Sequence, residues 1–209
     1  MRRDIALALV CLAGLAAAGC RDGAAPQKTD YAGEVAAARA AKDAALGDPS
    51  DSPIQAERRG EFLPLAYFPP DAAYIVPASL KPATAREVVR MPTSTGETRN
   101  MDRVGTLEFT LKGQLLSLGA FVESGSADVS RLFVPFTDLT SGTETYAAGR
   151  YLDLDRTRTG LYVIDFNRAY HPYCYYNPQY DCPYPPPENR LPVPVRAGER
   201  VRERTPANR

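Results

Sequence analysis

The residues best suited to chemistry are carboxylates and arginines in the second half of the chain. Two carboxylates at a suitable separation can act as general acid and base, and an arginine can hold an anionic group. The sequence contains no Gly-x-Ser-x-Gly elbow, His-Glu-x-x-His motif or phosphate-binding loop, so a binding role is favoured over catalysis. If the protein is an enzyme, we expect its chemistry to come from Glu144, Asp153, Asp165, Glu188, Arg150 and Arg168.

Tyrosines gather in the same region. Nine of the twelve lie between Leu132 and Gly198. Polar aromatic residues at this density form either a packed irregular loop or a binding surface, and the sequence leaves both open. The proline-rich segment 183–194 follows, and it favours an extended path that clamps the tyrosine-rich loop. A proline-motif ligand for a partner domain is the alternative.

The first residues have the composition of a lipoprotein signal peptide. Arg2 and Arg3 precede an apolar run, residues 5–18, that is too short to span a bilayer. Small residues lead to Cys20, so we expect cleavage after residue 19 and lipid on Cys20. Residues 20–29 then form a tether that reaches at most ~35 Å. Arg21, rather than aspartate, follows the cysteine, which favours the periplasmic face of the outer membrane by resemblance to enterobacterial sorting.

Charge indicates no nucleic-acid partner. The whole chain has 25 basic and 25 acidic residues, and removal of residues 1–19 leaves a net charge of −1. Residues 201–209 form a short basic tail that we expect to be disordered. The sequence does not indicate an oligomeric state.

Two cysteines and a histidine lie close together in the sequence after this export signal. His171, Cys174 and Cys182 could offer three metal ligands, but no motif supplies a fourth. We therefore predict no metal and no cofactor, and a disulfide between Cys174 and Cys182 in an oxidising compartment. Closing so short a loop restricts the unfolded chain by about 2.5 kcal/mol in the entropic model.

Several motifs occur in a fixed order in this half of the chain. They are Phe133–Phe136, Thr145–Tyr146, Gly149–Asp153, Asp165–Tyr170, Cys182–Pro183 and Pro186–Pro192, with Tyr67–Asp71 upstream. Together they resemble the bacterial family called domain of unknown function 1684, over roughly residues 30–200. The resemblance implies one domain over that range, but no reaction, because the family has no established activity. His171 replaces the asparagine that the family usually has there.

The candidate ligand-binding residues come from these motifs. A predicted hairpin joins residues 151–154 to residues 161–166 and places Leu154 opposite Leu161. Arg150 then lies opposite Asp165 on one face, either as a structural ion pair or as two polar groups at the rim of a pocket. The candidate set is Arg150, Tyr151, Asp153, Asp165, Asn167, Arg168, Tyr170, Glu188, Asn189 and Arg190.

The elements that position these residues are one helix followed by strands. Asp30 is a plausible N-cap, and apolar residues recur at helical spacing until Gly47 and Pro49 end the helix. Its narrow stripe, which we expect to lie against the domain, is Tyr31, Val35, Ala38, Ala41, Ala45 and Leu46. The period then changes to two, which predicts strands over residues 74–76, 87–91, 104–111, 114–122, 132–136, 143–148, 151–154, 161–166 and 193–196.

The clearest hairpin turns at Lys112–Gly113, where glycine can adopt the positive φ of a two-residue turn. It pairs Leu111 with Gln114, Phe109 with Leu116, Leu107 with Leu118 and Gly105 with Ala120. We therefore predict a mainly antiparallel β-sandwich or partly open barrel with one N-terminal helix. The function favoured is an envelope lipoprotein that binds a small polar ligand, glycan or partner. The alternatives are a hydrolase-like enzyme using the same cleft and a structural lipoprotein.

Overall fold

A computed structural model describes residues 30–157, 159 and 161–202. The predicted signal peptide, the lipid site at Cys20, the tether and residues 203–209 of the basic tail lie outside the described residues. The described residues from Tyr31 onward belong to one compact unit. No described helix is long and apolar enough to cross a membrane.

Helix α1 (Tyr31–Gly47) begins directly after Asp30 and ends two residues before Pro49, as predicted. Its face toward the barrel differs from the predicted alanine stripe. Val35 and Leu46 are buried, whereas the three stripe alanines Ala38, Ala41 and Ala45 are exposed. Between the two buried residues, the polar side chains of Arg39 and Lys42 contact the rest of the domain. Polar contacts therefore hold the helix in addition to apolar packing.

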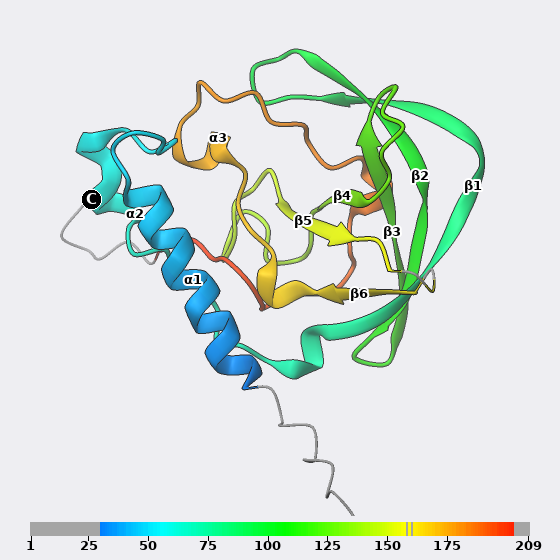
Figure 1. Ribbon diagram of the computed structural model, residues 1–209, viewed down its shortest axis with the longest axis horizontal. Helices are drawn as coiled ribbons and strands as arrows, with labels where there is room; N and C mark the ends of the chain where they lie inside the picture. Colours follow the sequence, from blue (N-terminus) through cyan, green and yellow to red (C-terminus); the bar gives the residue numbers. More distant parts are fainter. Residues whose placement is uncertain (1–29, 158, 160, 203–209) are drawn as a thin grey trace, which may run out of the picture. The chain divides into compact units, whose positions relative to one another are not determined.

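Six antiparallel strands form one sheet that curves into a nearly closed barrel (Figure 1). The strands are β1 (Ile75–Pro92), β2 (Thr98–Leu111), β3 (Gln114–Glu123), β4 (Arg131–Phe136), β5 (Arg150–Asp155) and β6 (Leu161–Asp165). Their order is β5-β4-β3-β2-β1-β6. In Figure 1 the long strands β1 and β2 curve along one side, and α1 lies on the opposite side. The predicted fold class, mainly antiparallel β with one N-terminal helix, is confirmed, and of the two predicted alternatives, sandwich and partly open barrel, the structure has the barrel.

The β2–β3 hairpin has the predicted register. Leu111 pairs with Gln114, and Leu107 pairs with Leu118. Lys112 and Gly113 both have positive φ, at 49° and 81°, as the two-residue turn requires. Leu107 and Leu118 are fully buried and point into the barrel core, which is built from alternate residues of all six strands.

Strand β1 is longer than the sequence indicates. It joins the two segments predicted at residues 74–76 and 87–91, and its register against β2 shifts between Pro82 and Glu87. Proline has no N–H to donate to the neighbouring strand, so the alternating strand pattern of the sequence is interrupted there. The strand nevertheless continues through the irregularity. The strands predicted at residues 143–148 and 193–196 were wrong, since both segments are loops.

The predicted hairpin between residues 151–154 and 161–166 was also wrong. Strand β5 pairs with β4, and β6 pairs with β1, so that Asp165 lies opposite Ile75. Tyr162 and Ile164 point into the core, while Leu161 and Val163 are exposed. Both faces of β6 carry apolar side chains, so alternation could not determine which face is buried.

The remaining described helices are single turns. They are η1 (Ala56–Arg58), α2 (Arg59–Phe62), η2 (Ala72–Tyr74), η3 (Phe166–Arg168), α3 (Tyr173–Tyr176) and η4 (Pro187–Asn189). After η4, residues 190–199 follow an extended path, and we call this segment the strap. It runs along residues 137–139, with Leu191 N donating to Thr137 O at 2.8 Å. Leu139 N donates to Val193 O in turn at 3.3 Å. The proline-rich segment therefore packs against the barrel as an extended strap.

Candidate functional site

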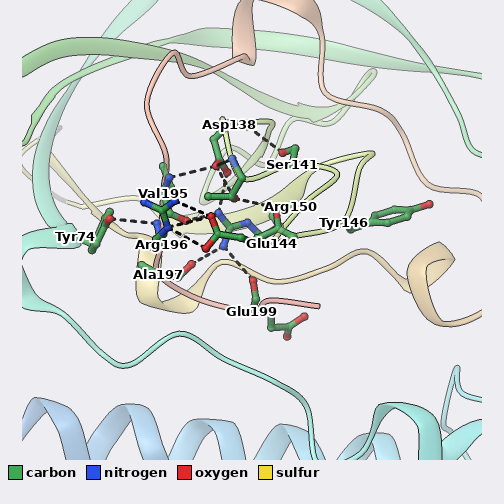
Figure 2. A network of polar contacts seen from close by, with 12 residues as sticks. Tyr74, Asp138, Ser141, Glu144, Tyr146, Arg150, Val195, Arg196, Ala197 and Glu199 are labelled. Carbon is green, nitrogen blue, oxygen red and sulfur yellow. Dashed lines mark hydrogen bonds and ion pairs between the residues drawn. The ribbon is translucent and has the colours of Figure 1, made fainter. Parts of the chain in front are cut away.

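Arg150 lies inside the barrel (Figure 2). Strand β5 turns it toward the core together with Leu152 and Leu154, and its side chain is fully buried. Its guanidinium donates to Asp138 Oδ2 at 2.8 Å and to three main-chain carbonyl oxygens of the strap, those of residues 195, 197 and 199. Burial lowers the pKa of Arg150, and the Asp138 carboxylate opposes that shift. Arg150 is therefore a structural link between the barrel and the strap.

Asp165 has partners other than the predicted Arg150. Tyr31 Oη of helix α1 lies 2.8 and 2.9 Å from its two carboxylate oxygens. Arg168 Nε donates to Asp165 Oδ2 at 3.0 Å, and Asn167 Nδ2 donates to Asp165 Oδ1 at 3.1 Å. The predicted Arg150–Asp165 pair was wrong because the two strands lie at different edges of the sheet, and each residue is paired elsewhere.

Asn189 is a structural residue between β3 and β4. The register set by Phe121 and Phe133 places Gly119 opposite Pro135, which has no N–H to donate. The Asn189 amide replaces that missing pairing. Its Oδ1 accepts from Gly119 N at 2.7 Å, and its Nδ2 donates to Gly119 O at 2.9 Å and to Pro135 O at 2.7 Å. A Cβ at Gly119 would lie 2.9 Å from Phe121 Cζ and 3.1 Å from Asn189 Oδ1, so a larger residue would have to displace one of these side chains.

The two neighbours of Asn189 face outward. Glu188 forms an ion pair with Arg103 of β2, and Arg190 is exposed. Neither lines the large cavity described next. Glu144, another candidate for catalysis, pairs with Arg196 on the surface. The structure therefore separates the predicted carboxylates and arginines instead of gathering them in one cleft.

A cavity of about 710 Å³ lies against the outer face of the sheet. Phe121, Phe133 and Asp153 are cross-strand neighbours on β3, β4 and β5, and all three line it. Alternate residues of the same strands, such as Val134 and Leu152, point into the barrel. Tyr170, Pro172, Tyr173 and residues 180–183 also line it. We call this cavity the aromatic cleft.

Aromatic rings make up much of its lining. Phe133 and Tyr151 meet edge to face at 4.7 Å, and Tyr151 contacts Tyr170 at 5.9 Å. Tyr173 and Tyr180 form a second edge-to-face pair at 5.3 Å, and they are 47% and 37% exposed. Two of the rings therefore present apolar surface to solvent at the rim of the cleft.

Polar groups at the cleft are held in place by one another. Tyr170 Oη donates to Asp153 Oδ2 at 2.9 Å. Burial, followed by the Asp153 carboxylate, raises the pKa of Tyr170, so its hydroxyl stays protonated as the donor. Arg99 Nη2 donates to Asp181 Oδ2 at 3.1 Å, and hydroxyls of Thr93 and Thr95 lower the pKa of Asp181. Asp181 is therefore ionised at neutral pH.

The cleft includes three of the ten predicted ligand-binding residues, Tyr151, Asp153 and Tyr170. Sequence reasoning missed Arg99, Arg131 and Asp181. The rim pair, Tyr173 and Tyr180, was not among the ten candidates, although the tyrosine density of this region indicated a binding surface as one of two alternatives. Nothing in the local sequence marks the arginines, because β2 and β4 bring them to the cleft from far along the chain.

Cys182 lines the cleft, and Cys174 lies beside it. Both are buried free thiols in the structure, which does not show the predicted disulfide. Cys174 N lies 3.3 Å from Cys182 Sγ. The hydrogen bond between the thiols lowers the pKa of Cys174 to about 7 and raises that of Cys182. Among the described residues, no three histidine, cysteine or carboxylate side chains are placed to hold a metal ion.

His171 belongs to a buried network around Glu199. Its backbone N–H donates to Glu199 Oε2 at 2.7 Å, and Tyr176 Oη donates to the same oxygen at 2.9 Å. Lys42 of α1 pairs with the other carboxylate oxygen. Burial, with Arg150 and Lys42 nearby, lowers the pKa of His171 well below its usual value. The ring is therefore neutral, and its Nε2 accepts from Tyr146 N at 3.3 Å.

The fold and cleft define a small antiparallel barrel protein with an N-terminal helix and an aromatic cavity on its outer face. Residues 60–200 match the model of a protein family of unknown function, DUF1684, and the chain belongs to this family. It is similar to the solution NMR structure of an uncharacterized protein of Haloarcula marismortui, with 38% identity and a TM-score of 0.65. The match covers 82% of this chain and 94% of that one. No curated protein matches the chain.

Proposed function

We propose that this protein is a lipid-anchored envelope module that binds a neutral, hydroxyl-rich ligand, a glycan segment, in the aromatic cleft. The observation that carries the proposal is a cavity of about 710 Å³ that combines exposed tyrosine rings with hydrogen-bonded planar polar groups. Its volume lies within the range of small-molecule sites, which are mostly apolar with a few oriented polar groups. A sugar ring has matching chemistry, with apolar C–H faces and hydroxyls that both donate and accept.

The charges of the cleft support a neutral ligand. Three cations, Lys42, Arg99 and Arg131, face four carboxylates of the lining, those of residues 123, 128, 153 and 181. A lining this nearly balanced gives little attraction to a highly charged ligand. Asp153 and Arg99 are already fixed by Tyr170 and Asp181, so less side-chain freedom is lost on binding.

Calorimetric titration of the purified protein with chitotriose and maltotriose tests this proposal. We expect saturable binding to at least one of them. Tyr173→Ala and Tyr180→Ala should each weaken binding about tenfold, because each removes a stacking surface at the rim. Leu139→Ala is the matched control, since Leu139 is 56% exposed and does not line the cleft. Absence of heat with both sugars, or binding unchanged in both tyrosine variants, contradicts the proposal.

A hydrolase that uses the same cleft is the second candidate, because Asp153 and Asp181 both line it. Hydrogen bonds hold Asp181 ionised, so Asp153 would have to protonate the leaving group. Asp153→Asn should then abolish release of reducing ends from a bound oligosaccharide while binding persists. If the wild-type protein binds a sugar and releases no reducing ends, the module is non-enzymatic.

The cellular setting is part of the same proposal. Lipid on Cys20 would hold the domain close to its membrane, at the periplasmic face of the outer membrane. Metabolic labelling with an alkyne fatty acid should mark the wild-type protein and fail to mark Cys20→Ser. A protein unlabelled in both forms contradicts the anchor.

We further propose that Cys174 and Cys182 are joined as a disulfide after export. Their adjacency and the lowered pKa of Cys174 support this, because thiolate is the form that reacts in exchange. The two thiols would lose two protons and two electrons to a disulfide donor of the envelope. Thiol titration under denaturing conditions should find neither cysteine free in protein isolated from the envelope, and two free thiols contradict the disulfide.

A further inference from the structure

A second cavity, of about 190 Å³, lies between helix α1 and the segments that contain Tyr67 and residues 167–170. Lys42 and Tyr170 line both this cavity and the aromatic cleft, whereas Arg39, Tyr67 and Arg168 line the second one alone. We call it the α1 cavity. Its chemistry differs from that of the cleft because cations dominate its lining.

Arg39 enters this cavity with two of its three guanidinium nitrogens lacking an acceptor among the described residues. Its Nη1 donates to Phe68 O at 3.1 Å, and its guanidinium lies 4.3 Å from the centre of the Tyr67 ring. Nε and Nη2 are buried and have no acceptor in the described part of the chain. These two nitrogens form one side of the guanidinium, where their N–H bonds run parallel and match two oxygens of a carboxylate or phosphate.

Tyr67 adds a third donor. Its Oη is also buried without a partner among the described residues. Arg59, Arg103 and Arg150 each leave a single Nε without an acceptor, but only Arg39 among the described residues leaves a complete two-nitrogen fork. A buried donor without an acceptor destabilises the fold unless another group provides that acceptor.

The charges that line the α1 cavity also favour an anion. Arg39, Lys42 and Arg168 face a single carboxylate, that of Glu199. Glu199 is already paired with Lys42, and Arg168 is paired with Asp165 at 3.0 Å. Arg39, the third cation of this lining, forms no ion pair with another described residue.

We propose that the α1 cavity binds a small oxyanion, a carboxylate or phosphate group, through the Nε–Nη2 fork of Arg39 and the hydroxyl of Tyr67. The cavity has the volume of about six water molecules at ~30 Å³ each, which suits an anion of a few heavy atoms. The proposal is independent of glycan binding in the cleft. It assigns α1 a role in recognition as well as in packing.

The test follows arginine Nε–H resonances of the purified full chain by NMR, at constant ionic strength, during titration with sodium phosphate or sodium acetate. One Nε–H signal, assigned to Arg39 by its loss in Arg39→Lys, should shift and saturate. Tyr67→Phe should weaken that binding about tenfold, since it removes one hydrogen bond to a charged group and keeps the ring that supports Arg39. Stronger binding of phosphate or of acetate identifies which group the cavity accepts.

Arg131→Lys is the matched control, because Arg131 lines the aromatic cleft and not the α1 cavity. It should leave the anion titration unchanged and alter only glycan binding. A shift that grows without saturation for both anions overturns the proposal, and so does a dissociation constant unchanged in Tyr67→Phe. The first result would mean that water alone serves these donors, and the second that Tyr67 does not contact the bound anion.

Discussion

Two buried residues near the strap, Arg150 and His171, show that the chemical type of a residue does not by itself determine whether it binds a ligand or stabilises the fold. Alternation along β5 correctly predicts that Arg150 shares a face with Leu152 and Leu154. Its partner could not be predicted, because Asp138 comes from a loop whose path no periodic pattern encodes. Arg150 therefore stabilises the fold, although its charge made it a candidate for binding.

Arg150→Met should destabilise the protein by about 3–5 kcal/mol, because it leaves the buried Asp138 carboxylate without its cation and three strap carbonyls without a donor. Urea denaturation measures the change. Arg131→Met is the control, since the Arg131–Asp155 pair is exposed and its loss should have little effect on unfolding. A small effect of Arg150→Met would mean that the strap is held by other contacts.

His171 predicts a pH dependence of stability. The unfolded state takes up a proton below the ordinary histidine pKa of 6.5, whereas the buried ring stays neutral until far lower pH. The unfolded state therefore binds more protons, and the free energy of unfolding falls by up to about 1.4 kcal/mol per unit as pH falls from 6.5 to about 5. Above pH 6.5 both states are neutral and this contribution is flat.

Urea denaturation at a series of pH values measures that slope. His171→Gln should remove it, since the chain has no other histidine. The same slope in wild type and variant would assign the dependence to another group. A flat wild-type profile between pH 6.5 and about 5 would mean that the ring titrates normally in the folded protein.

At the scale of elements, prediction succeeded where turn chemistry and side-chain alternation agree. The β2–β3 hairpin is the example, with its register and its buried face both confirmed. Strand β6 could not be placed because both of its faces are apolar. The bounds of α1 follow from residues that start and stop a helix, but its contact face includes Arg39 and Lys42, which a hydrophobic pattern assigns to solvent.

The side-chain amide of Asn189 links η4 to strands β3 and β4. Asn189→Asp should destabilise the fold by about 3 kcal/mol, because a carboxylate cannot donate to Gly119 O and Pro135 O and would lie against both oxygens. Thermal or urea unfolding measures the loss. Asn177→Asp is the matched control, since Asn177 Oδ1 accepts from Gln179 N and a carboxylate keeps that contact. Equal effects of the two substitutions would contradict this role of Asn189.

At the scale of the whole molecule, the cleft and the α1 cavity form where distant segments meet. The tyrosines of residues 170–180 indicated one wall of the cleft from sequence. Arg99, Arg131 and Lys42 come from β2, β4 and α1, and only the closure of the sheet and the docking of the helix bring them to that wall. Family membership and the barrel fold were predictable, whereas the composition of the site depends on these long-range contacts.

Amide chemical-shift mapping of the protein during titration with chitotriose or maltotriose tests glycan binding in the aromatic cleft most directly. We expect saturable shifts at residues that line the aromatic cleft, with the largest at Tyr173, Tyr180 and Asp153. Exposed residues that do not line the cleft, such as Leu115 and Leu161, should not move. No saturable shifts with either sugar, or shifts centred away from the cleft, would contradict the assignment of this cavity as the glycan site.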